Sequence, residues 1–219
     1  MICFRNVNKF YETKNLKYRA LYDISFDINE GDYFVICGNS GCGKTTLLNL
    51  IGCMDYINEG EYIFKNLNIS NLKNSHLCKL RNEEFSFIFD YNSLIPELNL
   101  IENIEIPMIY SSISKKIRRE KVISYLKMIG LYKERYCYIN ELSKEQKQKL
   151  CIGRALINNG KIILVDEPGK FLQGYIYNEL LEILSNLNKE GYTIIVSGKN
   201  PKDFPCGNKF LTLNDGKIS

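Results

Sequence analysis

The sequence predicts an α/β fold in which helices flank a mainly parallel sheet, with an N-terminal antiparallel β part and an inserted α-helical lobe. Short apolar runs typical of buried strands recur along the chain. Helical patterns separate these runs, and strands that alternate with helices are typical of a parallel sheet covered on both sides. Residues 91–159 carry helical patterns and no clear strand. We therefore expect one domain over 1–219, with its core in 1–90 and 160–219 and a helical lobe between them.

The first thirty residues are expected to form strands. The runs are 2–7 and 21–28, and the second alternates apolar residues at Ile24, Phe26 and Ile28. A turn at Gly31 leads into 33–37, a short apolar run typical of a buried strand. A glycine-rich turn follows, and 45–53 then has a helical pattern.

The remaining elements follow the same two patterns. Further buried strands are expected at 85–89, 162–165, 193–196 and 210–213. Helices are expected at about 115–129, 145–157 and 175–190, the last with its apolar residues on one face. The order of these elements is what predicts the parallel sheet.

Composition is that of a globular protein that works in the cytosol. The chain has 219 residues, of which 45% are hydrophobic and 25% charged. No stretch approaches the roughly 20 apolar residues that cross a bilayer, and the first residues lack the layout of a signal peptide. We therefore expect the eight cysteines to be reduced thiols.

Charge is unevenly distributed along the chain. The formal net charge of +4 is too small to indicate nucleic acid, and no nucleic-acid partner is expected. Residues 111–150, however, hold eleven Lys and Arg against four Asp and Glu, a net charge of +7. This stretch is either a solvated helical face or a face that lies near anionic lipid headgroups.

A phosphate-binding loop is predicted directly after the strand at 33–37. The sequence there fits G-x-x-x-x-G-K-[ST] through Gly38, Asn39, Ser40, Gly41, Cys42, Gly43, Lys44 and Thr45. Glycines allow backbone N–H groups to wrap phosphates, and the following helix N-terminus adds partial positive charge. Lys44 is expected to reach the β- and γ-phosphates, and the Thr45 hydroxyl to bind magnesium.

The second half of this site is predicted at the end of the apolar run 162–165. Asp166 and Glu167 follow that run directly. Asp166 is expected to hold magnesium through water, and Glu167 to polarise an attacking water as general base. Either carboxylate alone could merely cap a strand, but together with the phosphate-binding loop they predict hydrolysis of a nucleoside triphosphate.

With both motifs placed, the whole chain resembles an ABC (ATP-binding cassette) nucleotide-binding domain. It is most similar to the short subunits of the macrolide-exporter, lipoprotein-release and antimicrobial-peptide-resistance group. Besides the two motifs, the segments that carry the resemblance are 6–11, 93–96, 102–107, 141–143, Gln146, 153–156 and 214–218. The resemblance implies a P-loop NTPase core that binds ATP with Mg²⁺.

The resemblance also implies further site residues and partners. Tyr11 is at the position of an aromatic that stacks on adenine, and Thr46 and Ser143 join the nucleotide-binding residues. The implied partners are a transmembrane permease subunit and a second ABC domain, identical or not, which pairs head to tail with the first. The implied location is cytoplasmic, peripheral on the inner face of the cell membrane.

Four motifs depart from the family pattern. Lys144 and Glu145 replace the two signature glycines, so side chains obstruct the approach of backbone N–H groups to a γ-phosphate. Asp90 stands where the family has a glutamine that senses magnesium, and the resemblance implies that its shorter carboxylate also belongs to the metal site. Gln173 stands where the family has an aspartate. Gly198 replaces the histidine that hydrogen-bonds the γ-phosphate.

These departures leave three functions open. The chain is a slow transporter ATPase, or a pseudo-ATPase that binds ATP while a partner hydrolyses it, or an ABC ATPase without a permease. We expect nucleotide binding with reduced hydrolysis, because losing one electrostatic donor typically costs about 10²–10³ in rate. The cargo and the direction of transport depend on residues outside this chain.

Overall fold

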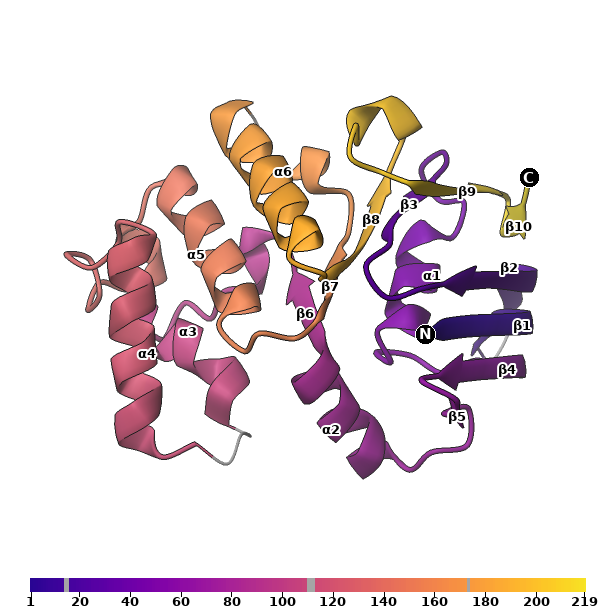
Figure 1. The fold of residues 1–219 in the computed structure, drawn as a ribbon, viewed down its shortest axis with the longest axis horizontal. Coiled ribbons are helices and arrows are strands. Elements are labelled where there is room, and N and C mark those ends of the chain that lie inside the picture. Colours follow the sequence, from indigo (N-terminus) through magenta and orange to yellow (C-terminus); the bar gives the residue numbers. More distant parts are fainter. Residues whose placement is uncertain (14–15, 110–112, 173) are drawn as a thin grey trace.

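A computed structural model describes residues 1–13, 16–109, 113–172 and 174–219, and these ranges form two sheets with helices around them (Figure 1). One sheet has six strands and the other four. The order in the larger sheet is β10 (Lys217–Ile218), β9 (Lys209–Asn214), β3 (Tyr33–Cys37), β8 (Thr193–Gly198), β7 (Ile162–Val165) and β6 (Phe85–Ile88). All its neighbours pair in parallel except β10 and β9. The predicted α/β fold class is confirmed.

The central strands are apolar throughout because both faces of the larger sheet are covered. Every residue of β3, β7 and β8 is buried. Phe34 and Ile36 of β3 pack into one core with α1 (Lys44–Ile51), whereas Val35 packs on the opposite face with α6 (Gly174–Lys189). This double burial is why these strands read as unbroken apolar runs rather than as alternating ones.

The smaller sheet is antiparallel and shares the core that contains α1. Its order is β2 (Leu16–Ile28), β1 (Ile2–Thr13), β4 (Glu59–Phe64) and β5 (Leu67–Asn68). The pairing of β1 with β2 has three register shifts. Phe4 and Tyr62 from this sheet pack with their rings tilted by 37° and the ring centroids 4.5 Å apart, in the core that also contains α1.

A third hydrophobic cluster lies between three helices on the side of the molecule away from the antiparallel sheet (Figure 1). The helices are α3 (Leu100–Ile109), α4 (Lys115–Met128) and α5 (Lys144–Leu156). Buried residues of this cluster run from Leu94 to Ile157. A further helix, α2 (Asn74–Glu84), leads into β6.

Several elements were predicted from the sequence with nearly the observed bounds, and others were missed. The strands at 33–37 and 162–165 match, and the other predicted strands and helices are shifted or extended at their ends. The sequence reasoning missed β4, β5, β10, α2 and α3. Only Leu77 of α2 is buried, so its sequence shows no apolar stripe, and α3 contains Pro107.

All eight cysteines are free thiols. Within the described ranges, no helix is long and apolar enough to cross a membrane.

Candidate functional site

The predicted phosphate-binding loop lies at the carboxyl end of β3 and leads into α1. Gly43 caps the helix with φ +106°, a backbone conformation that favours glycine. A Cβ at Gly43 would stand 2.9 Å from the carbonyl oxygen of Ala20 and 2.9 Å from Leu21. The loop is therefore packed against β2 so closely that only glycine fits at this position.

Lys44 is a buried cation enclosed by its own loop. Its Nζ donates to the carbonyl oxygens of Gly38 and Asn39, each at 2.7 Å, and only 4% of its side chain is exposed. The same Nζ lies 3.0 Å from Oε1 of Glu167, which follows β7. The structure thus brings together the predicted cation and the predicted base from segments more than a hundred residues apart.

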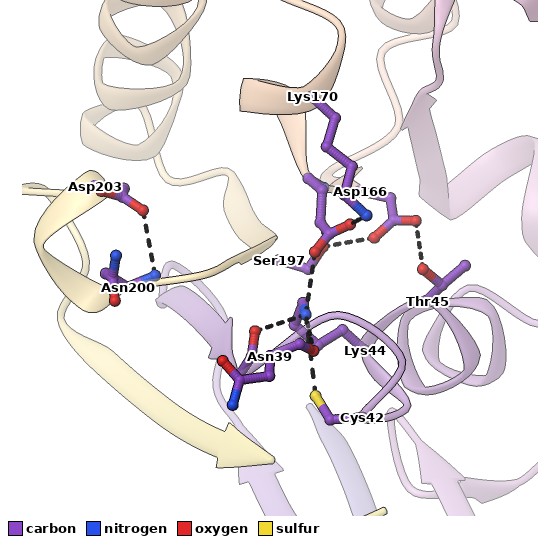
Figure 2. A network of polar contacts seen from close by, with 11 residues as sticks. Asn39, Cys42, Lys44, Thr45, Asp166, Lys170, Ser197, Asn200 and Asp203 are labelled. Carbon is purple, nitrogen blue, oxygen red and sulfur yellow. Dashed lines mark hydrogen bonds and ion pairs between the residues drawn. The ribbon is translucent and has the colours of Figure 1, made fainter. Parts of the chain in front are cut away.

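Asp166 lies between two hydroxyl groups. Thr45 Oγ1 donates to Asp166 Oδ2 at 2.7 Å, and Ser197 Oγ donates to Asp166 Oδ1 at 2.5 Å (Figure 2). Ser197 also accepts the backbone N–H of Glu167 at 2.9 Å. Ser197 therefore orients both carboxylate residues, a role that the sequence reasoning missed. Its signal was its place at the end of the neighbouring parallel strand β8, since ligands bind at the carboxyl ends of such strands.

The donor set at Thr45 and Asp166 fits Mg²⁺. A hydroxyl and a carboxylate are hard oxygen ligands, and Mg²⁺ usually takes one or two protein ligands and completes its shell with waters and substrate phosphates. The described residues contain no group of three or more His, Cys, Asp or Glu side chains that could enclose a metal by themselves. A shared site of this kind is consistent with the predicted role of both residues.

Glu167 adopts a left-handed backbone conformation, with φ 43° and ψ 59°. Non-glycine residues adopt it rarely, and such strain is concentrated at functional sites. Burial alone would raise the pKa of Glu167, but hydrogen bonds from Lys170 and Lys44 outweigh burial and lower that pKa. Glu167 is therefore held ionised between two ammonium groups.

A cavity of about 320 Å³ opens beside these residues. Its walls come from the phosphate-binding loop, the segment after β7 and the end of β8. Gly38, Ser40, Glu167, Lys170 and Gly198 are among the residues that line it. The cavity extends from the phosphate-binding loop to the predicted base. The terminal phosphate of a nucleotide bound to the loop would therefore lie in this cavity.

Tyr11 lies near the loop but on the antiparallel sheet. Its side chain is 41% exposed, and its hydroxyl donates to Asp55 Oδ2 at 2.9 Å. The Lys9 ammonium lies 4.7 Å from the centre of the Tyr11 ring and pairs with Asp55 Oδ1 at 2.7 Å. Burial raises the pKa of Tyr11, a hydrogen bond with Thr46 lowers it, and Asp55 raises it again. These contacts fix an exposed aromatic ring next to α1.

Two predicted site residues lie outside this network. Both carboxylate oxygens of Asp90 accept hydrogen bonds from Asn92, so in the structure Asp90 stabilises a turn of its own loop. Ser143 is the N-cap of α5 and exchanges hydrogen bonds with Gln146, at 3.2 Å and 2.9 Å. Among the described residues, neither hydrogen-bonds Thr45 or Asp166. Their predicted roles in binding magnesium and nucleotide remain predictions.

The departures from the family pattern can be placed as well. Lys144 and Glu145 are exposed in the first turn of α5, and Glu145 Oε2 accepts a hydrogen bond from Tyr175 of α6 at 2.9 Å. Gly198 is buried, and a Cβ there would stand 2.3 Å from Phe204. Phe204 thus fills the space in which a side chain at 198 would lie. Gln173 lies outside the described residues.

Comparisons with known proteins identify what this chain is similar to. A family model described as ABC transporter matches residues 21–170. The chain is 38% identical to YknY of Bacillus subtilis, an uncharacterized ABC transporter ATP-binding protein, over 100% of this chain and 95% of that protein. It is 35% identical to the macrolide export ATP-binding/permease protein MacB of Hyphomonas neptunium, of which it spans 34%. A dimeric structure of the ATP-binding cassette MJ0796 in a post-hydrolysis state, bound to ADP and Pi, shares 34% identity with a TM-score of 0.90, over 100% of this chain and 97% of that one.

Proposed function

The chain belongs to the ABC transporter family, and we propose that it is the ATP-binding subunit of a transporter whose permease is a separate partner or domain. The observation that carries this proposal is the convergence of Lys44, Thr45, Asp166 and Glu167 at the carboxyl edge of the parallel sheet. These groups are the cation, the magnesium ligands and the base that phosphoryl transfer to water needs.

Each residue has a defined task in hydrolysis. Backbone N–H groups of residues 38–43 and the Lys44 ammonium hold the phosphates, and Tyr11 offers its ring to adenine. Thr45 and Asp166 would hold Mg²⁺, which when bound neutralises charge on the phosphates. Glu167 orients and deprotonates the attacking water. Ser197 fixes Asp166 and the Glu167 backbone in place through its hydroxyl.

We infer that hydrolysis is slow, for two structural reasons. Gly198 offers no side-chain donor, and Phe204 blocks the space where one would stand. The pKa of Glu167 is also lowered, which makes its carboxylate a weaker base. These features equally support the second candidate function, in which the chain binds ATP and a partner cassette hydrolyses it. Measured turnover, with Glu167→Gln as the blank, separates the two.

A second cavity is the proposed docking groove for the permease. It measures about 920 Å³ and is lined by residues of α2, β6, α3 and α5. Met54 and Phe89 on its walls are 44% and 37% exposed. Exposed apolar side chains in a groove indicate a protein-binding site. The MacB relatives join an ATP-binding part and a permease in one protein, and this chain spans about a third of them.

Copurification with candidate permeases tests this part of the proposal. The parent chain should copurify with its permease, and Phe89→Ser should lose the complex while keeping its ATP affinity. Tyr18→Ser is the matched control, because Tyr18 is an exposed aromatic on β2 that does not line the groove. A complex that survives Phe89→Ser and is lost in Tyr18→Ser would place the permease on another face.

A further inference from the structure

Lys170 is a cation in the cavity that no motif of the sequence analysis includes. We propose that its ammonium binds the terminal phosphate of ATP and supplies the positive contact that Gly198 lacks. This inference deepens the proposed function and rests on its assignment of the phosphate-binding loop and of Glu167. Four observations support it.

The first is the turn that places Lys170. Glu167 has a left-handed backbone conformation, and residues Pro168–Lys170 after it form a short 3₁₀ helix. In this turn the Lys170 N–H donates a hydrogen bond to the Glu167 carbonyl oxygen at 2.9 Å. Side chains three residues apart eclipse in such a helix. Lys170 therefore stands directly over Glu167 and forms an ion pair with its Oε2. The backbone turn thus brings the two side chains to the same side of the segment.

The second is the direction of the side chain. Lys170 lines the cavity of about 320 Å³ together with Gly38, Asn39 and Ser40 of the phosphate-binding loop. Its side chain reaches toward the group formed by Lys44, Asp166 and Ser197 (Figure 2). The Lys170 side chain is 64% exposed, compared with 4% for Lys44. Lys170 can therefore adjust its ammonium to a bound phosphate, whereas Lys44 is enclosed by its loop.

The third is the local charge. Glu167 is one carboxylate facing two ammonium groups, because Lys44 lies 3.0 Å from Oε1 while Lys170 holds Oε2. Asp166 is hydrogen-bonded by the neutral hydroxyls of Thr45 and Ser197, so it does not use either cation. Two ammonium groups thus contact the single carboxylate of Glu167. An anion in hydrogen-bond reach of an ammonium forms a short, charge-assisted bond.

The fourth is the opposite wall, where Lys199 is the only side-chain cation among the described residues that line that part of the cavity. Gly198 has no side chain, Phe204 is apolar, and the Ser197 hydroxyl already donates to Asp166. Lys199 also lines the cavity, but it makes no hydrogen bond or ion pair with any described residue that would direct it inward. Lys170 is therefore the cation best placed to contact the phosphate farthest from the loop.

The test compares the affinity of ADP with that of a non-hydrolysable ATP analogue, because only the analogue has the terminal phosphate. Calorimetry with magnesium is run on the parent, Lys170→Met, Lys170→Arg and Lys199→Met. We expect Lys170→Met to reduce the preference for the triphosphate about tenfold, the order of one charge-assisted hydrogen bond. ADP affinity should stay within about twofold of the parent, which also shows that the variant folds. Lys170→Arg and Lys199→Met should keep the preference.

Three results would overturn the inference. An unchanged preference in Lys170→Met, with faster phosphate release, would show that Lys170 only restrains Glu167. An equal loss in Lys199→Met would show a diffuse charge effect instead of a direct contact. A parent protein that binds neither ADP nor the ATP analogue would overturn the proposed function itself. This outcome differs from the other two, in which the parent binds ADP.

Discussion

At the scale of single residues, the Lys44 ammonium is the group on which nucleotide affinity should depend most. Lys44→Ala removes the only cation buried within the phosphate-binding loop, among the residues described. We expect ATP affinity to fall about 10²-fold or more, since several charge-assisted bonds are lost together. Calorimetry measures the affinity, and Lys65→Ala, which breaks an exposed ion pair with Glu84, is the control. Equal ATP affinity in parent and Lys44→Ala would remove the basis for assigning this loop.

The magnesium site should depend on Ser197 as well as on Thr45. Ser197→Ala removes the hydroxyl that donates to Asp166 at 2.5 Å, and Thr45→Ala removes the predicted metal ligand itself. Changes in residues that orient metal ligands typically cost about 10–100-fold in metal affinity or activity. Both variants should weaken ATP binding in magnesium and leave it unchanged in EDTA. A loss of the same size in EDTA would mean that the two hydroxyls support the loop and not the metal.

Gly198 cannot be exchanged for a larger residue without changing Phe204. A Cβ at Gly198 would stand 2.3 Å from the Phe204 ring, and Phe204 is itself only 2% exposed. Gly198→Ala should lower the free energy of unfolding by about 1–3 kcal/mol, the usual cost of overpacking, and Gly198→His by more. Urea unfolding measures both. Gly198→Ala should cost less in a Phe204→Ala background than in the parent, a difference that a double-mutant cycle measures. If Gly198→Ala costs as much in that background as in the parent, the two side chains do not compete for one space. Placing the histidine that the resemblance implies at position 198 therefore requires a second substitution at Phe204.

At the scale of elements, the N-terminus of α5 should control pairing with a second cassette. Lys144 and Glu145 put side chains in the first turn of α5, where the resemblance described above implies glycines. In the Glu167→Gln background with ATP, we expect the chain to remain monomeric by light scattering at micromolar concentration. Lys144→Gly with Glu145→Gly should restore an ATP-dependent dimer. Lys144→Ala with Glu145→Ala separates charge from bulk, because alanine removes both charges and keeps a Cβ. A stable ATP-dependent dimer of the Glu167→Gln variant that still carries Lys144 and Glu145 would contradict the prediction.

Elements buried on two faces were predictable, and elements that depend on few buried residues were not. β3 and β7 read as strands because every residue in them is buried. In β4, the first three residues are exposed, and in α2 only Leu77 is buried, so neither has the periodicity that sequence reasoning needs. Their places are set by contacts with β1 and β6, which a local pattern does not contain.

The same distinction applies to the candidate site. Lys44, Thr45, Asp166 and Glu167 were predictable because spacing and a preceding strand define them. Lys170 and Phe204 were not, because the role of Lys170 comes from a 3₁₀ turn and that of Phe204 from the space that it fills beside Gly198. These roles depend on contacts between side chains in the folded protein, and the spacing of residues along the chain does not predict such contacts.

At the scale of the whole molecule, stability should fall in acid partly through Asp55, which ties β1 to the segment after α1. Burial would raise the pKa of Asp55, but hydrogen bonds from Lys9, Tyr56 and Tyr11 lower it. A carboxyl whose pKa is lower in the folded state contributes stability above its unfolded pKa of about 3.9, and loses it as pH falls through the folded value. Asp55→Asn should therefore make the free energy of unfolding depend less on pH below about 4.

This prediction is checked by urea unfolding of parent and variant between about pH 2.5 and 7. Asp55→Asn should also cost about 1–3 kcal/mol at pH 7, because the Lys9 ammonium, 8% exposed, loses its carboxylate partner. Asp27→Asn is the control, since Asp27 has a lowered pKa too but pairs with Arg5 at the surface. Parallel pH curves for the parent and Asp55→Asn would show that the pair contributes nothing to acid sensitivity.

The course of α5 through the molecule has a mechanical consequence. At one end Ser143 caps the helix beside the surface predicted to meet a second cassette, and at the other Arg154 and Ala155 line the groove proposed for the permease. A helix of 13 residues is about 20 Å long and nearly rigid over that length. A permease that displaced the groove end of α5 as a rigid body would therefore also displace its N-terminus. Under the proposed function, α5 would act as a lever that connects the two partner surfaces without any change in its own internal hydrogen bonds.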